Sequence, residues 1–406
     1  MTIRFIHAAD LHLGSPFKGF AGLSPEVLET VRESTFNAFR TLVRHAVETR
    51  PDFLLIAGDV YDGEDRSLKA QEVFRKGMQE LSSAGIPVFV SHGNHDHLAG
   101  TWVRFSLPDN VRIFGPHVSA FSLDVGGRTV KIHGFSYPER HVREPMIGEY
   151  PDASADGSVH IGMLHGSVRG DEAHDVYAPF TLGELLAKGY DYWALGHIHK
   201  RGLLSEDPPV VYSGNIQGLH RNETGPKGFY EVTIGEGRPV LKFVRSSALI
   251  FGRVEVDCSG NRHADEWIAR CLEGIGHFQS EHGPGIADVA VTGIGPEEER
   301  LFADAPESEW LAFLREAAAD RFPDIGLHRL SFRHENPAAA PAGLYRDVLE
   351  ELDGWDAAEW RALLSGLYGH RQAYRYVETM DAGFIEEVKA EAERMLASGI
   401  GNGGTT

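Results

Sequence analysis

The sequence predicts a layered α/β sandwich, and two observations support that prediction. Over about the first 245 of the 406 residues, short apolar runs typical of strands alternate with amphipathic stretches typical of helices. Later apolar runs in the same region are separated by glycine-centred turns, which favours antiparallel hairpins. Alternating strands and helices predict a mainly parallel sheet, and the hairpins predict antiparallel strands in addition.

The first part of the predicted sandwich is a βαβαβ unit. Its strands are IRFIHAA, DFLLIAG and IPVFVS, which begin at Ile3, Asp52 and Ile86. A helix with Ser24 as its candidate N-cap follows the first strand, and a second helix that ends at Gly85 precedes the third. Strands joined through helices in this way pair in parallel.

Further segments complete the expected sandwich. VHIGMLHG from Val159 and YDYWALG from Tyr190 are short and rich in β-branched or aromatic residues, as buried strands are. FSLDV with RTVKIHGFSY, and FYEVTI with PVLKFV, are expected to form hairpins.

The pattern changes after the sandwich, so we expect four regions. The sandwich occupies residues 1–245, a small α/β capping domain residues 246–335, and C-terminal helices residues 336–396. Residues 397–406, rich in glycine, are expected to form a flexible tail.

The composition limits the classes of protein. With 59 acidic and 39 basic side chains the net charge is −20, which argues against a protein that coats nucleic acid but not against an enzyme with a local cationic site. Only Cys258 and Cys271 are present, so no disulfide framework is expected and a reducing cytoplasm is favoured. The N-terminal residues lack the pattern of a signal peptide, and no apolar run is long enough to span a membrane.

Polar side chains follow five of the predicted strands at their carboxyl ends. They are Asp10, His12, Asp59, Asn94, His165, His197 and His199. Ligands of open α/β sheets bind at this edge, so we expect these side chains to converge. Seven nitrogen and oxygen ligands are too many for one tetrahedral zinc ion and suit two divalent ions that share a carboxylate. Without a thiolate, the set leaves manganese, iron and zinc open.

The alternative for each of these residues is a purely structural role. The chain has 21 histidines, most of which we expect to be solvated, so a single DxH or GHxH would be weak evidence. Five ligand-bearing strand ends on one scaffold are difficult to explain by chance. In extended chain, residues i and i+2 share a face, so Asp10 and His12 should point together, whereas Asn94 and His95 should point apart.

The motifs DLH, GD, GNHD, LHG and GHIH, in this order, resemble those of the calcineurin-like metallophosphoesterases over about residues 3–245. The stretches AADLHLGSPFKG, YWALGHIHKR and SGNIQGLHRNETGPKG resemble the SbcD/YhaO branch of DNA repair exonuclease subunits. The resemblance implies an α/β/β/α metallophosphoesterase sandwich with two divalent ions, preferentially manganese. It implies a first metal held by Asp10, His12 and His199, a second held by Asn94, His165 and His197, and Asp59 as the bridge.

The resemblance also implies roles around the metals. His95 would be the catalytic histidine that protonates the leaving oxygen, and Asp96 would orient its ring. The basic loop GLHRNETGPKG offers His220, Arg221 and Lys227 as nucleic-acid contacts. An ordinary connecting hairpin with solvated charge explains this loop equally well.

The function that the resemblance implies is that of a metal-dependent DNA exonuclease subunit, with endonuclease activity left open. It would work in DNA repair with an SbcC-like coiled-coil ATPase that docks on the C-terminal helices, and two copies would pair as a homodimer. An apolar cluster in those helices predicts either internal packing or this docking; its members are Trp355, Trp360, Leu363, Leu364 and Leu367.

Two other functions stay open. One is a metallophosphoesterase that hydrolyses nucleotides or small phosphodiesters. The other is a non-catalytic scaffold of an ATPase complex, against which the intact set of ligands and His95 argues.

Overall fold

The computed structural model describes residues 2–17, 19–20, 22–63, 67–100, 105–170, 177–295, 297–302 and 305–334, with isolated positions between 355 and 388. The chain forms two compact units. The first comprises Met1–Pro16 and Glu29–Phe251, and the second comprises Phe17–Leu28 and the chain from Gly252 onward. The chain therefore passes between the units at Phe17–Leu28 and again after Phe251.

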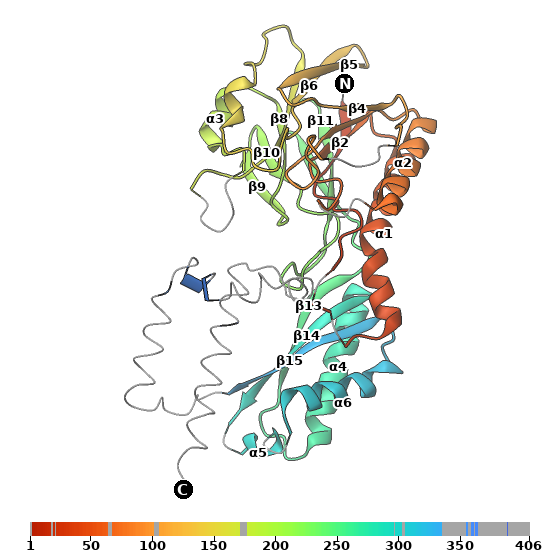
Figure 1. Ribbon diagram of the computed structural model, residues 1–406, viewed down its shortest axis with the longest axis vertical. Helices are drawn as coiled ribbons and strands as arrows, with labels where there is room; N and C mark the ends of the chain where they lie inside the picture. The colour runs from red at the N-terminus through yellow and green to blue at the C-terminus, as the bar shows by residue number, and fades with distance from the viewer. Residues whose placement is uncertain are drawn as a thin grey trace. The chain divides into compact units, whose positions relative to one another are not determined.

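The first unit contains two six-stranded sheets (Figure 1). In the first sheet, four strands pair in parallel: β1 (Ile3–Ala8), β2 (Phe53–Ala57), β3 (Val88–Ser91) and β4 (Val111–Ile113). The hairpin of β11 (Gly228–Ile234) and β12 (Val240–Arg245) joins the free edge of β1 in antiparallel orientation. The predicted βαβαβ unit and this hairpin are confirmed.

The second sheet has a parallel centre and antiparallel edges. Its strands, in spatial order, are β5 (Ser119–Val125), β6 (Arg128–Gly134), β7 (Val159–His165), β8 (Tyr192–Gly196), β10 (Pro209–Tyr212) and β9 (Gly202–Glu206). The predicted β5–β6 hairpin is confirmed, and β6, β7, β8 and β10 pair in parallel. The short pair β9–β10 is an addition to the predicted elements.

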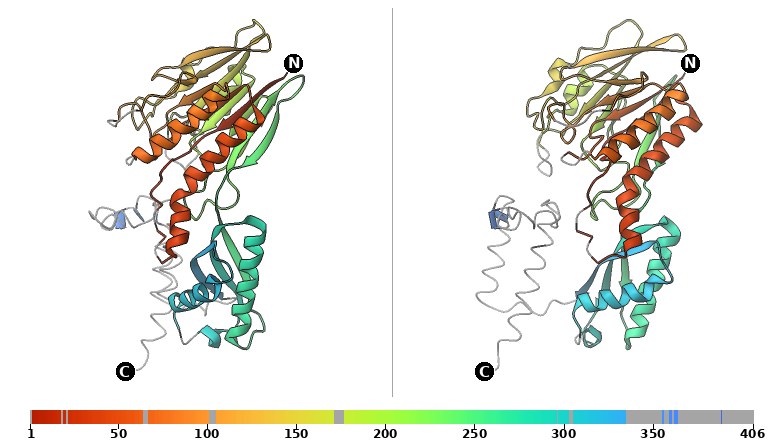
Figure 2. Two further views of the ribbon diagram at one scale, coloured as in Figure 1. Left: turned by 90° about the vertical axis from the view of Figure 1, so that its right-hand side faces the viewer. Right: turned by 45° about the vertical axis from the view of Figure 1, so that its right-hand side comes forward.

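Helices cover the outer face of each sheet. Figure 1 and Figure 2 show α1 (Pro25–Thr49) and α2 (Leu68–Ser83) side by side along the first sheet. Gly77 lets these two helices approach closely, because a Cβ atom at this position would lie 2.6 Å from the Phe39 ring. The outer face of the second sheet packs on α3 (Leu182–Ala187), and a 3₁₀ turn, η1 (Met146–Glu149), contributes to the same core.

Alternating side chains of the strands build the layers. Along β1, Ile6 packs toward the helices, whereas Phe5 packs between the sheets, where its ring stacks on Phe53 at 5.0 Å. The core between the sheets is apolar and buried, and it combines residues of both sheets. The first unit is thus an α/β/β/α sandwich, which confirms the predicted fold class.

One polar side chain crosses this core. His7 on β1 is fully buried; its Nδ1 accepts from the Tyr192 hydroxyl at 3.0 Å, and its Nε2 donates to the Leu195 carbonyl at 3.2 Å. Burial lowers the pKa of His7 to about 3, although the bond to Leu195 opposes the shift. A neutral His7 therefore joins the two sheets.

The second unit is a three-stranded sheet with helices. The strands β13 (Ile250–Asp257), β14 (Gly285–Ile294) and β15 (Ile325–His334) lie in this order, with β14 and β15 parallel. The helices are α4 (Ala264–His282), α5 (Glu299–Phe302) and α6 (Glu307–Ala319). The rings of Trp267, Trp310 and Phe332 form an aromatic cluster inside the unit, and both cysteines are free and buried.

The expected C-terminal helices and tail lie almost entirely outside the described residues. Of the predicted apolar cluster there, the rings of Trp355 and Trp360 lie 5.2 Å apart, and Trp360 is buried. Leu363 is exposed, and Leu364 and Leu367 fall outside the described residues. None of the helices in the described part of the chain has the length and apolarity needed to cross a membrane.

Candidate metal centre

The predicted ligands follow strands of both sheets. Asp10 and His12 come after β1, Asp59 after β2 and Asn94 after β3, all in the first sheet. His165 ends β7, and His197 and His199 come after β8 of the second sheet. The backbone N–H of His197 donates to both oxygens of the Asp10 carboxylate, at 3.0 and 3.1 Å. The two sheets therefore bring their carboxyl ends to the same place.

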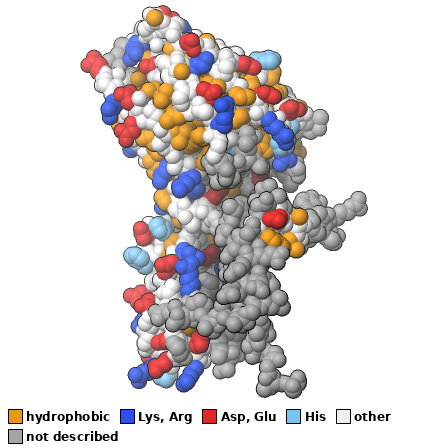
Figure 3. Space-filling view, turned by 90° about the vertical axis from the view of Figure 1, so that its left-hand side faces the viewer, with side chains coloured by type: hydrophobic (Ala, Val, Ile, Leu, Met, Phe, Trp, Pro, Cys, Tyr) orange, Lys and Arg blue, Asp and Glu red, His pale blue; other side chains and the backbone are white. Residues whose placement is uncertain are grey.

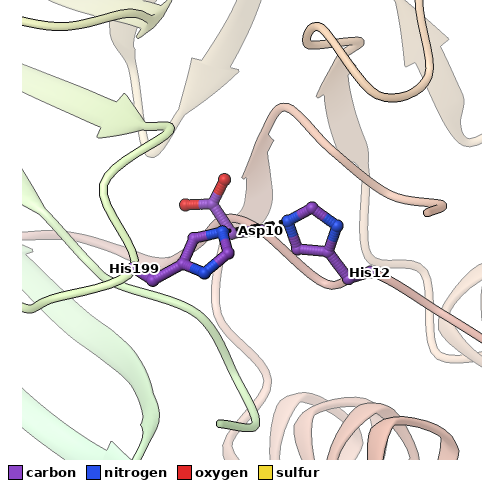
Figure 4. A group of neighbouring side chains, drawn as sticks. All are labelled: Asp10, His12 and His199. Atoms are coloured by element: carbon purple, nitrogen blue, oxygen red, sulfur yellow. Dashed lines mark hydrogen bonds between the residues drawn. The ribbon is translucent and has the colours of Figure 1, made fainter. Parts of the chain in front are cut away.

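Asp10, His12 and His199 form one group of candidate ligands (Figure 4). One ligand atom from each lies within 4.8 Å of the others. The Nε2 atoms of His12 and His199 are 3.0 Å apart. This group has the composition expected for the first metal.

Asp10, Asp59 and His165 form a second group within the same distance. The Nε2 atom of His165 lies 3.3 Å from an Asp59 oxygen and 3.0 Å from Oδ1 of Asn94. The His197 ring packs 5.2 Å from the His165 ring. All seven predicted ligands therefore lie in or beside one cluster.

Either carboxylate could bridge two ions. Asp10 belongs to both groups, whereas the expected bridge, Asp59, lies 3.7 Å from Nε2 of His12 and 3.3 Å from Nε2 of His165. Asp59 thus reaches both sides of the cluster as well. The assignment of Asp59 as the bridge stays a prediction.

Left-handed backbone gives the ligands their directions. Asp10, His12, Asp59 and His197 have φ values of 51°, 41°, 49° and 98°, and they are four of the seven such non-glycine residues in the described chain. This region is sterically unfavourable for side chains other than glycine and is found where the surroundings enforce it, often at functional sites. Asp10 and His12 therefore converge through two left-handed residues and not through the alternation of an extended strand.

Glycines beside the ligands permit close approach. A Cβ atom at Gly58 would lie 2.1 Å from Nδ1 of His165, and one at Gly93 would lie 2.4 Å from an Asp59 oxygen. A Cβ atom at Gly196 would lie 1.8 Å from the carbonyl oxygen of Ala57. A side chain at any of these positions would displace a ligand or the strand that carries it.

The electrostatics of the cluster favour a bound cation. Burial raises the pKa of Asp10 to about 6, because desolvation of the carboxylate outweighs the opposing charges of His165 and His199. Burial acts to lower the pKa of His165, but the carboxylates of Asp59 and Asp10 outweigh it and raise this pKa to about 9. A proton on His165 thus partly neutralises the negative charge of Asp10 and Asp59, and a bound divalent cation would do the same. Imidazole, carboxylate and amide oxygen, without a thiolate, fit two divalent ions.

His95 lies beside the cluster, and its ring contacts a carboxylate. Its backbone N–H donates to Asp59 at 2.9 Å, and its ring Nδ1 lies 3.1 Å from Oδ1 of Asp62. Burial acts to lower the pKa of His95, but the bond to Asp62 and the charges of Asp59 and Asp62 outweigh it and raise this pKa. The side chain of His95 is 36% exposed, whereas that of Asp59 is 2% exposed.

The expected contact between Asp96 and His95 is wrong. One oxygen of the buried Asp96 carboxylate accepts from the N–H of Gly93 at 2.7 Å, and the other accepts from the N–H of Val60 at 2.9 Å and lies 2.7 Å from Nδ1 of His92. A buried carboxylate satisfies backbone donors first, and these bonds tie the GNHD loop to the loop after β2. Asp96 therefore holds the backbone of the loop that carries His95, but it does not orient the His95 ring.

The basic loop after β10 contacts the cluster from the second sheet's side. Nζ of Lys227 donates to the carbonyl of His199 at 3.2 Å, and burial lowers the pKa of Lys227. Lys227 is expected to contact nucleic acid, and it also contacts the backbone of the candidate ligand His199. His220 and Arg221 are half-buried. Their expected contacts with nucleic acid stay predictions.

Two carboxylates that contact site histidines are not predicted from the sequence. They are Asp62, beside His95, and Glu223, whose Oε1 lies 2.6 Å from Nδ1 of His199. The available signals are the second acid of GDVYD, three residues after Asp59, and the single acid of the basic stretch GLHRNETGPKG. Histidines that bind metals commonly donate their other N–H to a carboxylate, so acids near ligand motifs are candidates.

Comparison with known proteins identifies the family. The family model of the calcineurin-like phosphoesterases matches residues 3–201. The chain is 36% identical, over 97% of its length and 97% of the relative's, to the uncharacterised metallophosphoesterase YhaO of Bacillus subtilis.

Two more distant relatives carry the name DNA double-strand break repair protein Mre11. That of Methanocaldococcus jannaschii is 28% identical over 56% of this chain and 62% of its own length. That of Aeropyrum pernix is 27% identical over 63% of each. With a relative that matches almost end to end and a site of convergent ligands, the chain belongs to the calcineurin-like metallophosphoesterases, which are hydrolases with a dinuclear metal centre.

Proposed function

We propose that this metallophosphoesterase is the nuclease subunit of a DNA repair complex and hydrolyses DNA phosphodiesters as an exonuclease. Endonuclease activity at the same site is a second activity to be tested. The observation that carries the proposal is the arrangement of His95 over the ligand cluster. His95 is partly exposed and paired with Asp62, while Asp59 and His165 beside it are buried. A phosphodiester can therefore reach a proton donor and the cation site together.

In this proposal the seven ligands bind two divalent ions, with manganese preferred. Asp10, His12 and His199 would hold the first ion, and Asp59, which is near both His12 and His165, would be shared by the two. Asn94, His165 and His197 hold the second. The ions supply Lewis-acid activation of water and of a phosphate oxygen.

His95 acts on the substrate through its ring. Nδ1–H of His95 donates a hydrogen bond to the Asp62 carboxylate, which fixes the orientation of the ring. The Nε2–H of the same ring then stays available as a donor to the substrate. Nε2 donates to a phosphate oxygen and then transfers its proton to the leaving oxygen. The bond to Asp62 and the charges of Asp59 and Asp62 raise the pKa of His95, which favours the protonated ring that this step needs.

The choice of DNA as substrate rests on two arguments. Two relatives are named for DNA double-strand break repair. Attraction for a polyanion is local, because two divalent ions carry more positive charge than Asp10 and Asp59 remove. On the face seen in Figure 3, basic and acidic side chains are interspersed, which fits a local and not a global attraction.

The remaining parts of the proposal concern the cell. We assign the chain to the cytoplasm, as a homodimer with an SbcC-like coiled-coil ATPase that docks on residues 336–396. Residues 246–335 would act as a capping domain. The resemblance of SGNIQGLHRNETGPKG to the SbcD/YhaO branch supports these assignments.

The test compares two substrates in the presence of Mn²⁺. A 3′-labelled DNA oligonucleotide and a small chromogenic phosphodiester are incubated with the wild-type chain and with His95→Ala. Cleavage of DNA that is lost in the variant, with both metals still bound, supports the proposal. Hydrolysis of the small ester alone favours an enzyme of nucleotides or small phosphodiesters. Metal binding without either activity favours the scaffold.

A further inference from the structure

Glu223 holds the ring of a metal ligand from the side opposite the metal site. Its Oε1 lies 2.6 Å from Nδ1 of His199. Its other oxygen accepts from Nδ2 of Asn215 at 2.6 Å and from the N–H of Leu219 at 2.8 Å. Since these partners already satisfy Oε2, the carboxylate is fixed by three donors and presents Oε1 to a single histidine.

The contact with Glu223 determines the tautomer of His199, that is, which ring nitrogen carries the hydrogen and which has a free lone pair. A carboxylate can only accept, so Nδ1 of His199 carries the hydrogen. Nε2 of the neutral ring then presents its lone pair, and this atom lies 3.0 Å from Nε2 of His12 in the group with Asp10. Glu223 thus selects the tautomer that can ligate.

Two other candidate ligand rings, those of His165 and His12, have weaker partners at Nδ1. Nδ1 of His165 faces a neutral acceptor, the carbonyl of Ala57, at 3.0 Å. Nδ1 of His12 is buried and makes no hydrogen bond in the described part of the chain, and the Asp62 carboxylate lies 4.0 Å from it. A charged acceptor raises the basicity of an imidazole more than a carbonyl does. Among these three rings, only that of His199 has a carboxylate within hydrogen-bond distance of Nδ1.

The loop that carries Glu223 contacts His199 at two points. Glu223 holds the ring, and Nζ of Lys227 donates to the backbone carbonyl at 3.2 Å. The N–H of Asn215 donates to the same carbonyl at 3.3 Å. His199 is therefore positioned from the loop and not only from the end of β8.

We propose that Glu223 is a positioning residue for the first metal ion, which sets the affinity of the site of Asp10, His12 and His199 without altering the second site. The charge of the carboxylate and its bond to Nδ1 make His199 a stronger and better oriented ligand. The inference rests on the proposed dinuclear centre, but it does not depend on DNA as the substrate.

The experiment titrates the metal-free, full-length chain with Mn²⁺ by calorimetry. In Glu223→Gln, one of the two sites should bind about 10- to 100-fold more weakly, which is the usual effect of removing such a partner, and the other should keep its affinity. The control is Glu231→Gln, because Glu231 pairs with His45 at 2.9 Å in the same manner, away from the ligands. It should leave both affinities unchanged.

A second measurement tests whether Glu223 acts through His199. In a His199→Ala background, Glu223→Gln should leave the affinity of the remaining site unchanged. Excess Mn²⁺ should restore the activity of the single Glu223→Gln variant toward the wild-type kcat. Should the Gln variant not fold, Glu223→Asp keeps the charge, and its shorter side chain should weaken the same site alone.

Different failures have different meanings. Two unchanged affinities in Glu223→Gln, or equal weakening of both sites, would overturn the positioning role while the centre stands. A wild-type chain that binds no Mn²⁺ would overturn the dinuclear centre itself, and with it this inference.

Discussion

The Nε2 atoms of His12 and His199 lie 3.0 Å apart, at the ends of strands from different sheets. Two imidazole lone pairs at this distance repel each other, so a proton or a metal ion must lie between them. Asp10 adds a carboxylate to the same group. One cation site thus requires both sheets to be in place.

His12→Ala and His199→Ala should each remove one of two bound metal ions per chain. Each variant deletes a nitrogen ligand of the first group and leaves His165, Asn94 and Asp59 in the second. The measurement is the metal content of dialysed protein by mass spectrometry. His45→Ala, which alters a histidine bonded to Glu231, should retain both ions. Two ions retained in both ligand variants would contradict the assignment.

Asp62→Asn should slow catalysis without changing metal content. The raised pKa of His95 depends on Asp62, so the variant should lower this pKa and move the alkaline limb of the pH–rate profile to lower pH. The sign follows because a general acid works while it is protonated. Loss of the acid itself, in His95→Ala, should cost about 10²- to 10⁴-fold in kcat. An unmoved profile in Asp62→Asn would show that Asp62 does not act through His95.

Asp96→Asn should act mainly on stability. Asp96 accepts from the backbone of Gly93 and Val60, so the amide would replace one acceptor oxygen by a donor facing a donor. We expect the free energy of unfolding to fall by about 1–3 kcal/mol, measured by urea denaturation. The alkaline limb of the pH–rate profile should stay in place. A profile like that of Asp62→Asn would restore Asp96 as the partner of His95.

Gly58→Ala should destabilise the chain more than Gly237→Ala. Both glycines have positive φ, 91° and 96°, so both variants incur backbone strain of about 1–2 kcal/mol. A Cβ atom at Gly58 would also meet Nδ1 of His165 at 2.1 Å, whereas one at Gly237 meets no atom within 4 Å. Overpacking adds about 1–3 kcal/mol and should weaken metal binding in Gly58→Ala alone. Thermal unfolding compares the two variants.

Acid should destabilise the core through His7. Its pKa is about 3 in the folded chain and about 6.5 in an unfolded one, so between these values the unfolded state binds the extra proton. The free energy of unfolding should fall by about 1.4 kcal/mol per pH unit below pH 6.5, and His7 should contribute no pH dependence above it. Denaturation of metal-free wild type and His7→Gln at pH 7.0 and 5.5 isolates this contribution. Equal losses in both would contradict it.

The ligands could be predicted because their positions follow from strand ends. Asp10, Asp59 and His165 each come at the carboxyl end of an apolar run, and such ends meet at one edge of a parallel sheet. The sandwich could be predicted for the same reason, since its central strands are continuous apolar runs. The short elements α3 and β4 give too little periodicity for a sequence pattern to reveal them.

The contacts around the ligands could not be predicted in the same way. Asp96 is adjacent to His95 in sequence, but its carboxylate accepts from the backbone of Gly93 and Val60, and the His95 ring pairs with Asp62. Val60 and Asp62 both follow Asp59 after the end of β2, and the left-handed backbone of Asp59, with φ of 49°, is not apparent from the sequence. Side-chain partners follow local backbone geometry, which spacing in the sequence does not determine.

The meeting of two sheets at one buried acid–imidazole cluster also links metal supply to the lifetime of the protein. Ions that bind only the folded chain raise the free energy of unfolding by about 2.7 kcal/mol per site at a hundredfold excess over Kd. When free metal is scarce, this contribution disappears and the unfolded fraction rises. Proteases degrade the unfolded fraction, so the abundance of the enzyme in a cell should follow its metal as well as its synthesis.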